Sequence, residues 1–384
     1  MKILVVSNLY PPYYIGGYEI GCQNFVNYIQ KNTNNSTLVL TSNYGNPQIE
    51  EKNIERNLLT SWSYSKKSRF FVYIKNWYRE IQNRKIFLNT LNNFKPDKIV
   101  FWNMTGISLN MTRIAEKEKI PYCIYAFDEQ FSRLDEDFYT RQVRKVFKNF
   151  VPNIENIIFA SKFLKKSFLL SRKKNIKPKN NLVINWGVLT QSKRKLLLSK
   201  KKINILYIGQ IVKHKGLDIL LKAIGLLDNK ILNQINLNIF GGIHDKDFFL
   251  QNSKFIIKNK LQNIIKFNKK FKREDLKKIM IKHEILIFPS TWQEPFAISL
   301  LEAQSFGLAI IASDTGGTRE SLSNGQAGIL FKNKHYVELS KIIEKLIIKQ
   351  SLINKYSHAA QNNIKKKYNF SITAKKILNF IEKI

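Results

Sequence analysis

The chain has 384 residues, of which 44% are hydrophobic and 12% aromatic, a size and composition typical of a globular protein with two domains. Its 64 Lys and Arg outnumber its 28 Asp and Glu, so the formal net charge is +36. Such an excess of positive charge is compatible with binding to nucleic acid, to an anionic membrane surface or to phosphorylated small molecules. Part of the excess reflects a general enrichment in lysine. No run of 18 apolar residues predicts a membrane span, and the two cysteines, Cys22 and Cys123, lack metal-ligand spacing. We therefore expect a cytoplasmic protein with reduced thiols.

Short runs rich in β-branched residues alternate with helical stretches along the whole chain. Six predicted strands in the first half lie at residues 3–6, 37–41, 98–102, 122–126, 157–160 and 182–184. Six more in the second half lie at residues 203–208, 235–240, 264–267, 285–288, 308–312 and 329–331. Near-continuous apolar strands separated by helices are typical of parallel sheets covered on both faces. The pattern predicts an α/β protein with two doubly wound, Rossmann-like domains.

The segment between Trp62 and Phe87 is basic and aromatic. It holds eight aromatic residues and seven Lys or Arg against one acid, Glu80, with Phe70, Ile74, Trp77 and Ile81 at helical spacing. A basic amphipathic helix of this kind suits the headgroup layer of an anionic membrane. A helix that packs on the core and keeps a solvated basic face is the alternative, and the sequence leaves both open.

A basic segment at residues 191–202 separates the two sets of strands and is the best candidate for a linker. It contains the sequence SKRKLLLSKKK, with six basic residues. We predict an N-terminal domain over residues 1–190 and a C-terminal domain over residues 203–365. The last predicted element is a helix within residues 366–384, which can return to the first domain.

Two carboxylates follow the predicted strand at residues 285–288. Glu294 falls in the loop after this strand, and Glu302 falls two turns into the next helix, so seven residues separate them. Ligands of open α/β sheets collect at the carboxyl ends of the strands. The free amides at the start of the helix, near Ala297, can receive phosphate oxygens. The pattern predicts a site for a phosphorylated ligand.

Four segments, in chain order, resemble the family-4 glycosyltransferases of the GT-B fold, whose signature is two glutamates seven residues apart. They are PPYYIGGYE from Pro11, GQIVKHKGLDIL from Gly209, PSTWQEPFAISLLEAQSFGLAIIAS from Pro289 and SDTGGTRE from Ser313. The resemblance covers almost the whole chain. It implies two Rossmann-like domains facing a cleft and the transfer of a hexose-type sugar from a UDP- or GDP-sugar to a glycan or lipid-linked acceptor. It also implies retention at the anomeric carbon and a place in cell-surface polysaccharide or lipopolysaccharide synthesis.

The resemblance also implies roles for individual residues. Lys215 would grip the donor diphosphate, Glu302 would accept hydrogen bonds from the ribose hydroxyls, and Glu294 would hold hydroxyls of the transferred sugar without acting as a nucleophile. The other implied donor-binding residues are Gly16, Gly17, Gly209, Gln210, Phe296, Ala297, Ile298 and Ser299. Asp128 is assigned an acceptor-orienting role, with a structural loop aspartate as the alternative. Each role has a simpler alternative. Lys215 can be an ordinary surface lysine, Gly16 and Gly17 can form a simple turn, and the two glutamates can cap a helix or be solvated.

Three positions depart from the family's pattern. Gln210 stands where an arginine is usual, so that Lys213 or His214 would have to supply the missing charge. Phe127 precedes Asp128 where many members have a histidine, and Ala297 replaces the glycine that usually follows the phenylalanine.

Two rival functions are compatible with the sequence. A non-catalytic relic that binds nucleotide sugars would keep Glu302 and the glycines, and a nucleic-acid-binding protein would explain the charge. Because the basic residues are dispersed and no nucleic-acid-binding module is visible, no nucleic-acid partner is expected. The histidines show no ligand spacing, so neither a metal nor another cofactor is predicted. Peripheral contact with the inner face of the membrane follows only if the basic aromatic segment binds lipid.

Overall fold

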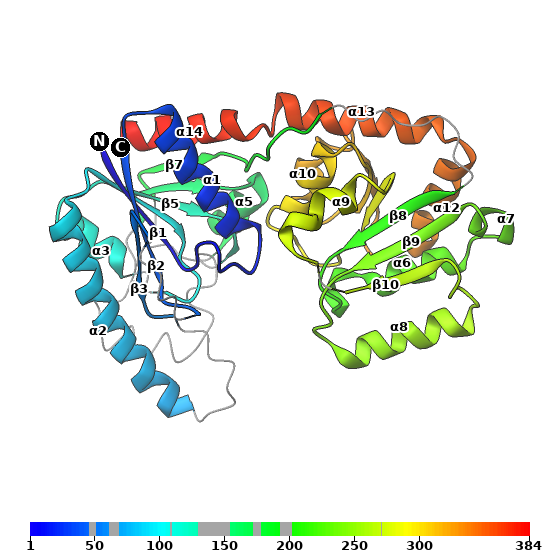
Figure 1. The fold of residues 1–384 in the computed structure, drawn as a ribbon, viewed down its shortest axis with the longest axis horizontal. Coiled ribbons are helices and arrows are strands. Elements are labelled where there is room, and N and C mark those ends of the chain that lie inside the picture. Colours follow the sequence, from blue (N-terminus) through cyan, green and yellow to red (C-terminus); the bar gives the residue numbers. More distant parts are fainter. Residues whose placement is uncertain are drawn as a thin grey trace. The chain divides into compact units, whose positions relative to one another are not determined.

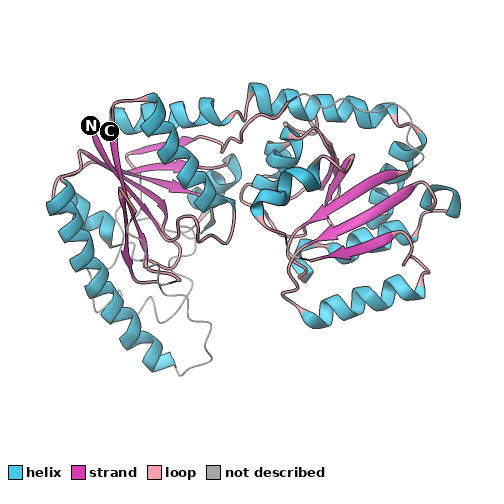
Figure 2. Ribbon diagram, in the orientation of Figure 1, coloured by secondary structure: helices cyan, strands magenta, loops and turns pink. Residues whose placement is uncertain are grey.

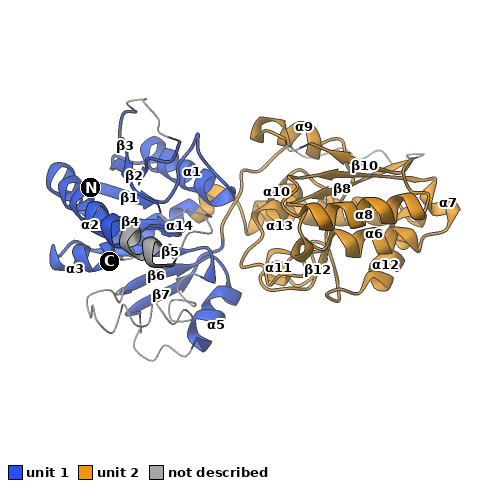
Figure 3. Cartoon of the chain, turned by 90° about the horizontal axis from the view of Figure 1, so that it is seen from below, with its two compact units in different colours: residues 1–185, 374–384 blue, residues 186–373 orange. Residues whose placement is uncertain are grey.

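The computed structural model describes residues 1–45, 51–60, 69–107, 110–129, 154–171, 178–192, 202–269 and 271–384, with the side chains of residues 69–76 left out. The chain divides into two compact units (Figure 3). Unit 1 comprises Met1–Asn185 and Ala374–Ile384, and unit 2 comprises Trp186–Thr373. Each unit is described by itself.

Unit 1 is built on a seven-stranded sheet in the order β3-β2-β1-β4-β5-β6-β7 (Figure 1), and every neighbouring pair is parallel. Its strands are β1 (Lys2–Ser7), β2 (Ser36–Ser42), β3 (Ile54–Leu58), β4 (Lys98–Asn103), β5 (Tyr122–Ala126), β6 (Asn156–Phe159) and β7 (Asn180–Val183). Six of them coincide with predicted strands to within two residues at either end. The sequence analysis missed β3, because this edge strand, IERNL, buries only its last residue and lacks an apolar run.

Helices alternate with the strands of unit 1 (Figure 2). They are α1 (Gly17–Asn32), α2 (Arg69–Phe94), α3 (Met111–Lys117) and α5 (Lys162–Leu170), together with the part of α14 (Phe370–Lys383) that starts at Ala374. Aromatic side chains fill the core between α1 and the sheet: the Trp102 ring lies 5.2 Å from that of Phe25 and 5.1 Å from that of Tyr125. These strands are therefore buried by large side chains rather than by aliphatic residues alone.

Unit 2 is built on a six-stranded parallel sheet in the order β10-β9-β8-β11-β12-β13. Its strands are β8 (Ile203–Ile208), β9 (Ile235–Phe240), β10 (Ile265–Asn268), β11 (Ile285–Phe288), β12 (Ala309–Ser313) and β13 (Ile329–Phe331). Its helices are η3 (Lys213–Lys215), α6 (Leu217–Gly225), α7 (Asn229–Leu232), α8 (Lys246–Lys258), η4 (Arg273–Asp275), α9 (Leu276–Met280), α10 (Ile298–Ser305), α11 (Thr318–Ser321), α12 (Tyr336–Ile348) and α13 (Ser351–Lys366). All six strands expected here are present.

The strands of unit 2 are buried on both faces, as their apolar runs predict. Alternate residues of β8 enter different clusters: Ile205 packs with residues of α6 and α12, whereas Leu206 packs with residues of α9 and α10. Residues of β11 divide in the same way, with Ile285 in the first cluster and Leu286 in the second. This two-sided burial holds the carboxyl ends of β8 and β11 in place.

Each sheet reverses its strand order at one point. In unit 1 the reversal lies between β1 and β4, and in unit 2 it lies between β8 and β11. Loops that leave two adjacent parallel strands in opposite directions open a crevice at the carboxyl edge, where open α/β sheets bind ligands. The order of the strands therefore predicts that ligands bind at the loops after β1 and β4 in unit 1 and after β8 and β11 in unit 2.

The division between the units falls upstream of the boundary expected at residue 190. The stretch after Asn185 lies in unit 2, where the Val188 amide donates to the Tyr368 carbonyl at 2.8 Å and the Phe370 amide donates to the Val188 carbonyl at 3.0 Å. Of the linker expected at 191–202, the structure describes only residues 191, 192 and 202. The last helix begins at Phe370, inside the expected span of 366–384, and joins unit 1 from Ala374.

Candidate functional site

Glu294 lies in the loop after β11 and is 8% exposed. Its Oε1 accepts two hydrogen bonds, from Lys215 Nζ at 2.6 Å and from the hydroxyl of Ser290 at 2.8 Å. Burying a carboxylate costs free energy unless the charge is paired and hydrogen-bonded, and this one is both. The structure thus brings together two of the predicted site residues, Lys215 and Glu294, which lie 79 positions apart in the sequence.

The position of Lys215 depends on a glycine. Lys215 ends η3, and Gly216 follows with φ of +71° in the left-handed region. A Cβ at this position would lie 1.9 Å from the carbonyl oxygen of Pro289, so only glycine fits. The same loops are joined by the backbone, because the Thr291 amide donates to the His214 carbonyl at 2.9 Å. The loops after β8 and β11 therefore hold each other.

Two glycines in the loop after β12, Gly316 and Gly317, contact the backbone of Glu294. The Gly317 amide donates to the Glu294 carbonyl at 2.7 Å, and Gly316 has φ of +49°. A Cβ on Gly316 would lie 2.4 Å from the Glu294 carbonyl oxygen. The segment SDTGGTRE, one of the four that carry the family resemblance, therefore has a structural task in unit 2: it allows the loop after β12 to approach the backbone of Glu294.

The imidazole of His214 is exposed, and its ring centroid lies 6.1 Å from that of Trp292. Partial burial, followed by the charge of Lys215, lowers the pKa of His214, while Glu294 acts in the opposite direction. A lowered pKa favours the neutral form of the imidazole.

Helix α10 carries the second glutamate. Its N-cap, Ala297, is buried and offers no side-chain hydrogen bond, so within the described residues the amides of Ile298 and Ser299 have no side-chain cap. Ile298 and Ser299 open the helix in half-buried positions, next to the buried Phe296. The N-terminus is therefore available to an anion from outside the chain.

Glu302 lies on α10 and forms an ion pair with Arg273 of η4. Arg273 Nη2 donates to Glu302 Oε1, with the side chains 40% and 13% exposed, respectively. The sequence analysis did not identify Arg273. The signal that could have found it is its place shortly after β10, at the same carboxyl edge of the sheet as the other site residues.

Gly209 and Gln210 follow β8. The nearest atom to a Cβ on Gly209 would be the Tyr207 hydroxyl at 3.4 Å, so a methyl group here would make an ordinary van der Waals contact without a clash. Gln210 is exposed, and its carbonyl accepts from that hydroxyl at 3.2 Å. Gly241, which the sequence analysis missed, allows this close packing, because a Cβ on it would lie 1.8 Å from the Gly209 carbonyl oxygen.

Gly16 and Gly17 lie in unit 1, where they begin α1. Gly16 is the N-cap, and its amide donates to the Glu19 carboxylate at 3.1 Å. Burial raises the pKa of Glu19, while backbone amides, including that of Gly16, lower it. Arg56 of β3 holds the preceding segment, donating to the carbonyls of Tyr10 at 3.0 Å and Pro11 at 2.6 Å.

Asp128 follows β5 in the same unit and accepts a hydrogen bond from the Thr105 hydroxyl at 2.9 Å. Its neighbour Phe127 stacks on Tyr18, with ring centroids 4.7 Å apart. Because Tyr18 directly follows Gly17, the glycine segment and the Asp128 loop meet at the carboxyl edge of the unit 1 sheet. The predicted residues of this unit therefore also gather at one edge.

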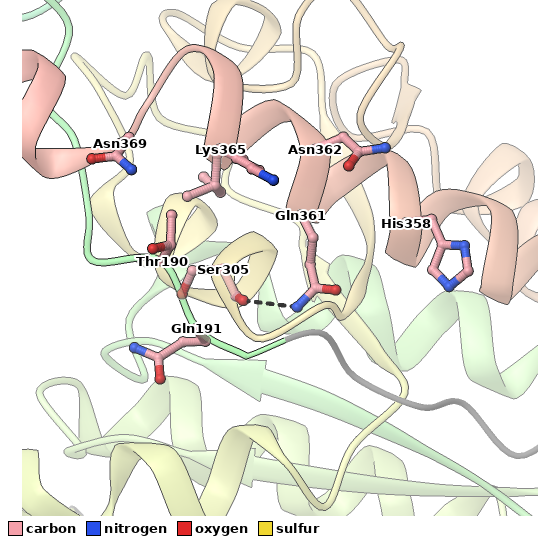
Figure 4. Close-up of a pocket in the computed structure, with 9 residues that line it drawn as sticks. Thr190, Gln191, Ser305, His358, Gln361, Asn362, Lys365 and Asn369 are labelled. Atoms are coloured by element: carbon pink, nitrogen blue, oxygen red, sulfur yellow. Dashed lines mark hydrogen bonds between the residues drawn. The ribbon is translucent and has the colours of Figure 1, made fainter.

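A polar cavity of about 470 Å³ lies elsewhere in unit 2 (Figure 4). It is lined by Thr190, Gln191, Ser305, His358, Gln361, Asn362, Ile364, Lys365 and Asn369. Ser305 is the last residue of α10, and its carbonyl accepts from the Gln361 side-chain amide at 3.2 Å. The cavity thus adjoins the C-terminal end of α10, and none of the predicted site residues lines it.

The basic aromatic segment is described only in part. Residues 62–68, and the side chains of residues 69–76, lie outside the described residues. In the remainder, Trp77 and Tyr78 are 55% and 56% exposed, whereas Phe87 and Arg79 are buried. Helix α2 therefore packs on unit 1 near its end and presents two aromatic side chains to solvent nearer its start.

Two kinds of feature are absent from the described part of the chain. No group of three or more His, Cys, Asp and Glu side chains is arranged there to hold a metal ion. None of its helices is both long enough and apolar enough to span a membrane.

Residues 188–367 match the family model of glycosyl transferases group 1. An uncharacterized glycosyltransferase of Methanocaldococcus jannaschii is 25% identical over 100% of this chain and 99% of its own length. These matches support a group 1 glycosyltransferase. The N,N'-diacetylbacillosaminyl-diphospho-undecaprenol alpha-1,3-N-acetylgalactosaminyltransferase of Campylobacter jejuni is 27% identical over 53% of this chain and 52% of its own length.

Solved structures show the fold of this chain. HepE of Anabaena, crystallised with UDP and glucose, superposes with a TM-score of 0.74 over 100% of both chains at 16% identity. The two parallel-sheet α/β units form a GT-B fold, as the sequence predicted. The matched span, 188–367, contains Lys215, Glu294 and Glu302.

Proposed function

We propose that this glycosyltransferase moves a hexose-type sugar from a UDP- or GDP-sugar to a glycan or lipid-linked acceptor, with retention at the anomeric carbon. The observation that carries the proposal is the contact of Lys215 Nζ with Glu294 Oε1 at 2.6 Å. It lies where the strand order of unit 2 reverses, at the carboxyl ends of β8 and β11. A cation, a hydroxyl-binding carboxylate and the free amides of α10 are the groups that a sugar diphosphate needs.

The chemistry follows from where charge develops. When the bond between the anomeric carbon and the diphosphate breaks, negative charge builds up on the departing oxygen. The ammonium of Lys215 and the first amides of α10 stabilise this charge. The acceptor oxygen forms the new bond from the face that the diphosphate leaves, and its proton passes to a phosphate oxygen. No side chain acts as a nucleophile, and no metal is required.

Glu294 positions the sugar in this scheme. Because Ser290 and Lys215 both donate to its Oε1, the carboxylate has a defined orientation before the donor arrives. Its acceptor oxygens can then bind sugar hydroxyls next to the anomeric carbon. Glu302 would bind the ribose hydroxyls, while the backbone at Gly209 would approach the phosphates. Asp128 would orient the acceptor.

The relatives support the substrate classes. HepE was crystallised with UDP and with glucose, and the name of the Campylobacter enzyme gives it a diphospho-undecaprenol-linked acceptor. We therefore propose a role in the synthesis of a cell-surface polysaccharide or lipopolysaccharide, at the cytoplasmic face of the membrane. Contact with that membrane would involve α2, where Trp77 and Tyr78 are exposed.

Two substitutions test the site. Lys215→Ala and Glu294→Ala should each lower turnover by about 100-fold or more, the usual loss when one group that stabilises the transition state is removed. The measurement is the release of UDP or GDP from a panel of nucleotide sugars in the presence of oligosaccharide and polyprenyl-diphosphate-linked acceptors. Addition of EDTA should leave the wild-type rate unchanged.

Lys222→Ala is the matched control, because this lysine side chain is 47% exposed and lies outside the candidate site, where it pairs with Asp218 at 3.8 Å and lies 6.0 Å from the Tyr336 ring centroid. It should retain the wild-type rate. All variants should melt within a few degrees of the wild type, which separates lost chemistry from lost folding. Wild-type turnover in both Lys215→Ala and Glu294→Ala would defeat the site assignment.

A further inference from the structure

The partner of Glu302 is the most informative contact that the family resemblance does not account for. Arg273 reaches Glu302 from η4, the short turn between β10 and α9, and its Nη2 donates to Glu302 Oε1. The two residues are 29 positions apart in the sequence. In the part of the chain that the structure describes, no hydrogen bond reaches Oε2 of Glu302.

Stability alone does not explain this pair. The Arg273 side chain is 40% exposed, and ion pairs of exposed arginine contribute little to the free energy of unfolding. Glu302, in contrast, is only 13% exposed, so its carboxylate has few orientations and little access to water. A guanidinium differs from an ammonium in being planar and rigid, which makes it suited to orienting a carboxylate.

The neighbouring lysine provides a contrast. Lys272 precedes Arg273 and faces solvent, with an 84% exposed side chain whose Nζ lies 3.8 Å from the carboxylate of Glu274, a side chain that is 73% exposed. The two adjacent cations therefore differ in what they contact. Lys272 lies near the surface carboxylate of Glu274, whereas Arg273 contacts Glu302, the carboxylate of the candidate ribose site. The local sequence is highly basic, but only Arg273 is directed to Glu302.

We propose that Arg273 is a positioning residue of the nucleotide site: it holds Oε1 of Glu302 so that Oε2 accepts a hydrogen bond from a ribose hydroxyl of the donor. The inference rests on the proposed function, because it assumes that Glu302 meets the ribose. Arg273 acts through Glu302 and need not touch the sugar that is transferred. Its loss should therefore affect recognition of the ribose more than the chemical step.

The test compares nucleotides that differ by one hydroxyl. Isothermal titration would measure the dissociation constants of UDP and 2′-deoxy-UDP, and of GDP and 2′-deoxy-GDP, for the full chain. The wild type should prefer one of the ribonucleotides over its deoxy analogue by about tenfold or more, the effect of one hydrogen bond to a charged group. Arg273→Ala should reduce this preference to about threefold or less, and Glu302→Gln should do the same.

Three further variants make the result specific. Arg273→Lys keeps the positive charge but lacks the planar guanidinium group, so it should retain only part of the preference for the ribonucleotide. Arg273→Ala introduced into Glu302→Gln should cause no additional loss, because both act on one hydrogen bond. Lys272→Ala should keep the wild-type preference. The melting temperature of each variant checks that it is folded.

The outcomes separate the two proposals. If the wild type prefers the ribonucleotide and Arg273→Ala keeps that preference in full, Arg273 does not position Glu302 and this inference fails while the proposed function stands. If the wild type binds neither UDP nor GDP, the proposed function fails and takes the inference with it. A loss of preference in Lys272→Ala equal to that in Arg273→Ala would also overturn it, since general charge would then be the cause.

Discussion

At the scale of single residues, the glycines of unit 2 have two different tasks. Gly216 is required by the fold itself, because its φ of +71° and the Pro289 carbonyl, 1.9 Å from a Cβ, leave no room for a side chain. Gly209 is not required in this sense, because a Cβ there would meet nothing closer than 3.4 Å. A glycine that the fold does not require is compatible with a ligand that approaches the backbone.

Alanine substitutions should distinguish these tasks. Gly216→Ala should lower the free energy of unfolding by about 1–3 kcal/mol, because it combines a strained backbone with a steric clash. Gly209→Ala should change this free energy by less than about 0.5 kcal/mol. Chemical denaturation of both variants would measure these effects.

Nucleotide binding should respond differently. Gly209→Ala should weaken the binding of UDP or GDP by about tenfold, because a methyl group would displace the phosphates from the backbone. Wild-type affinity in this variant would show that the diphosphate does not approach Gly209. A large loss of stability in Gly209→Ala would contradict the absence of a clash at this position.

At the scale of elements, α2 combines two properties that the sequence presented as alternatives. It buries Phe87 and Arg79 in unit 1, yet Trp77 and Tyr78 are more than half exposed on the same helix. Burial lowers the pKa of Arg79, with Glu80 acting against this. One helix can therefore pack on the core along part of its length and present aromatic side chains to another surface.

A membrane role for α2 makes a testable prediction. Changing Trp77 and Tyr78 together to Ser should reduce binding to vesicles of phosphatidylglycerol and phosphatidylcholine by about tenfold or more, because aromatic burial in the interface is lost. Co-flotation with the vesicles provides the measurement. Tyr336→Ser, which removes a 38% exposed tyrosine from unit 2, is the matched control. Unchanged flotation of the double variant would remove the membrane hypothesis.

At the scale of the whole molecule, the charge of +36 has to be reconciled with a specific ligand. An anionic nucleotide sugar is one answer, and non-specific attraction to polyanions is another. The two differ in stoichiometry and salt dependence. A nucleotide that binds one site raises the stability of the folded chain by about 2.7 kcal/mol at a hundred times its dissociation constant.

A thermal-shift screen should find one nucleotide, UDP or GDP, and its sugars that raise the melting temperature by several degrees. The shift should persist with EDTA, since no metal is proposed at the site. Random-sequence DNA should bind weakly and lose its affinity steeply as salt rises. If DNA raises the melting temperature more than every nucleotide sugar does, the charge serves nucleic acid and the glycosyltransferase proposal is wrong for this chain.

The sequence by itself determined twelve of the thirteen described strands and their α/β arrangement, because most of these strands are local apolar runs whose signal needs no distant partner. It also indicated Glu294 as a carboxylate after a buried strand, whereas the GT-B fold and Lys215 were implied by the family resemblance. Tertiary structure alone decided three features. The edge strand β3 forms by pairing with β2, residues 186–190 join unit 2 through Tyr368 and Phe370, and Arg273 meets Glu302. Each depends on a contact between distant positions, whose geometry no local pattern of polarity or charge encodes.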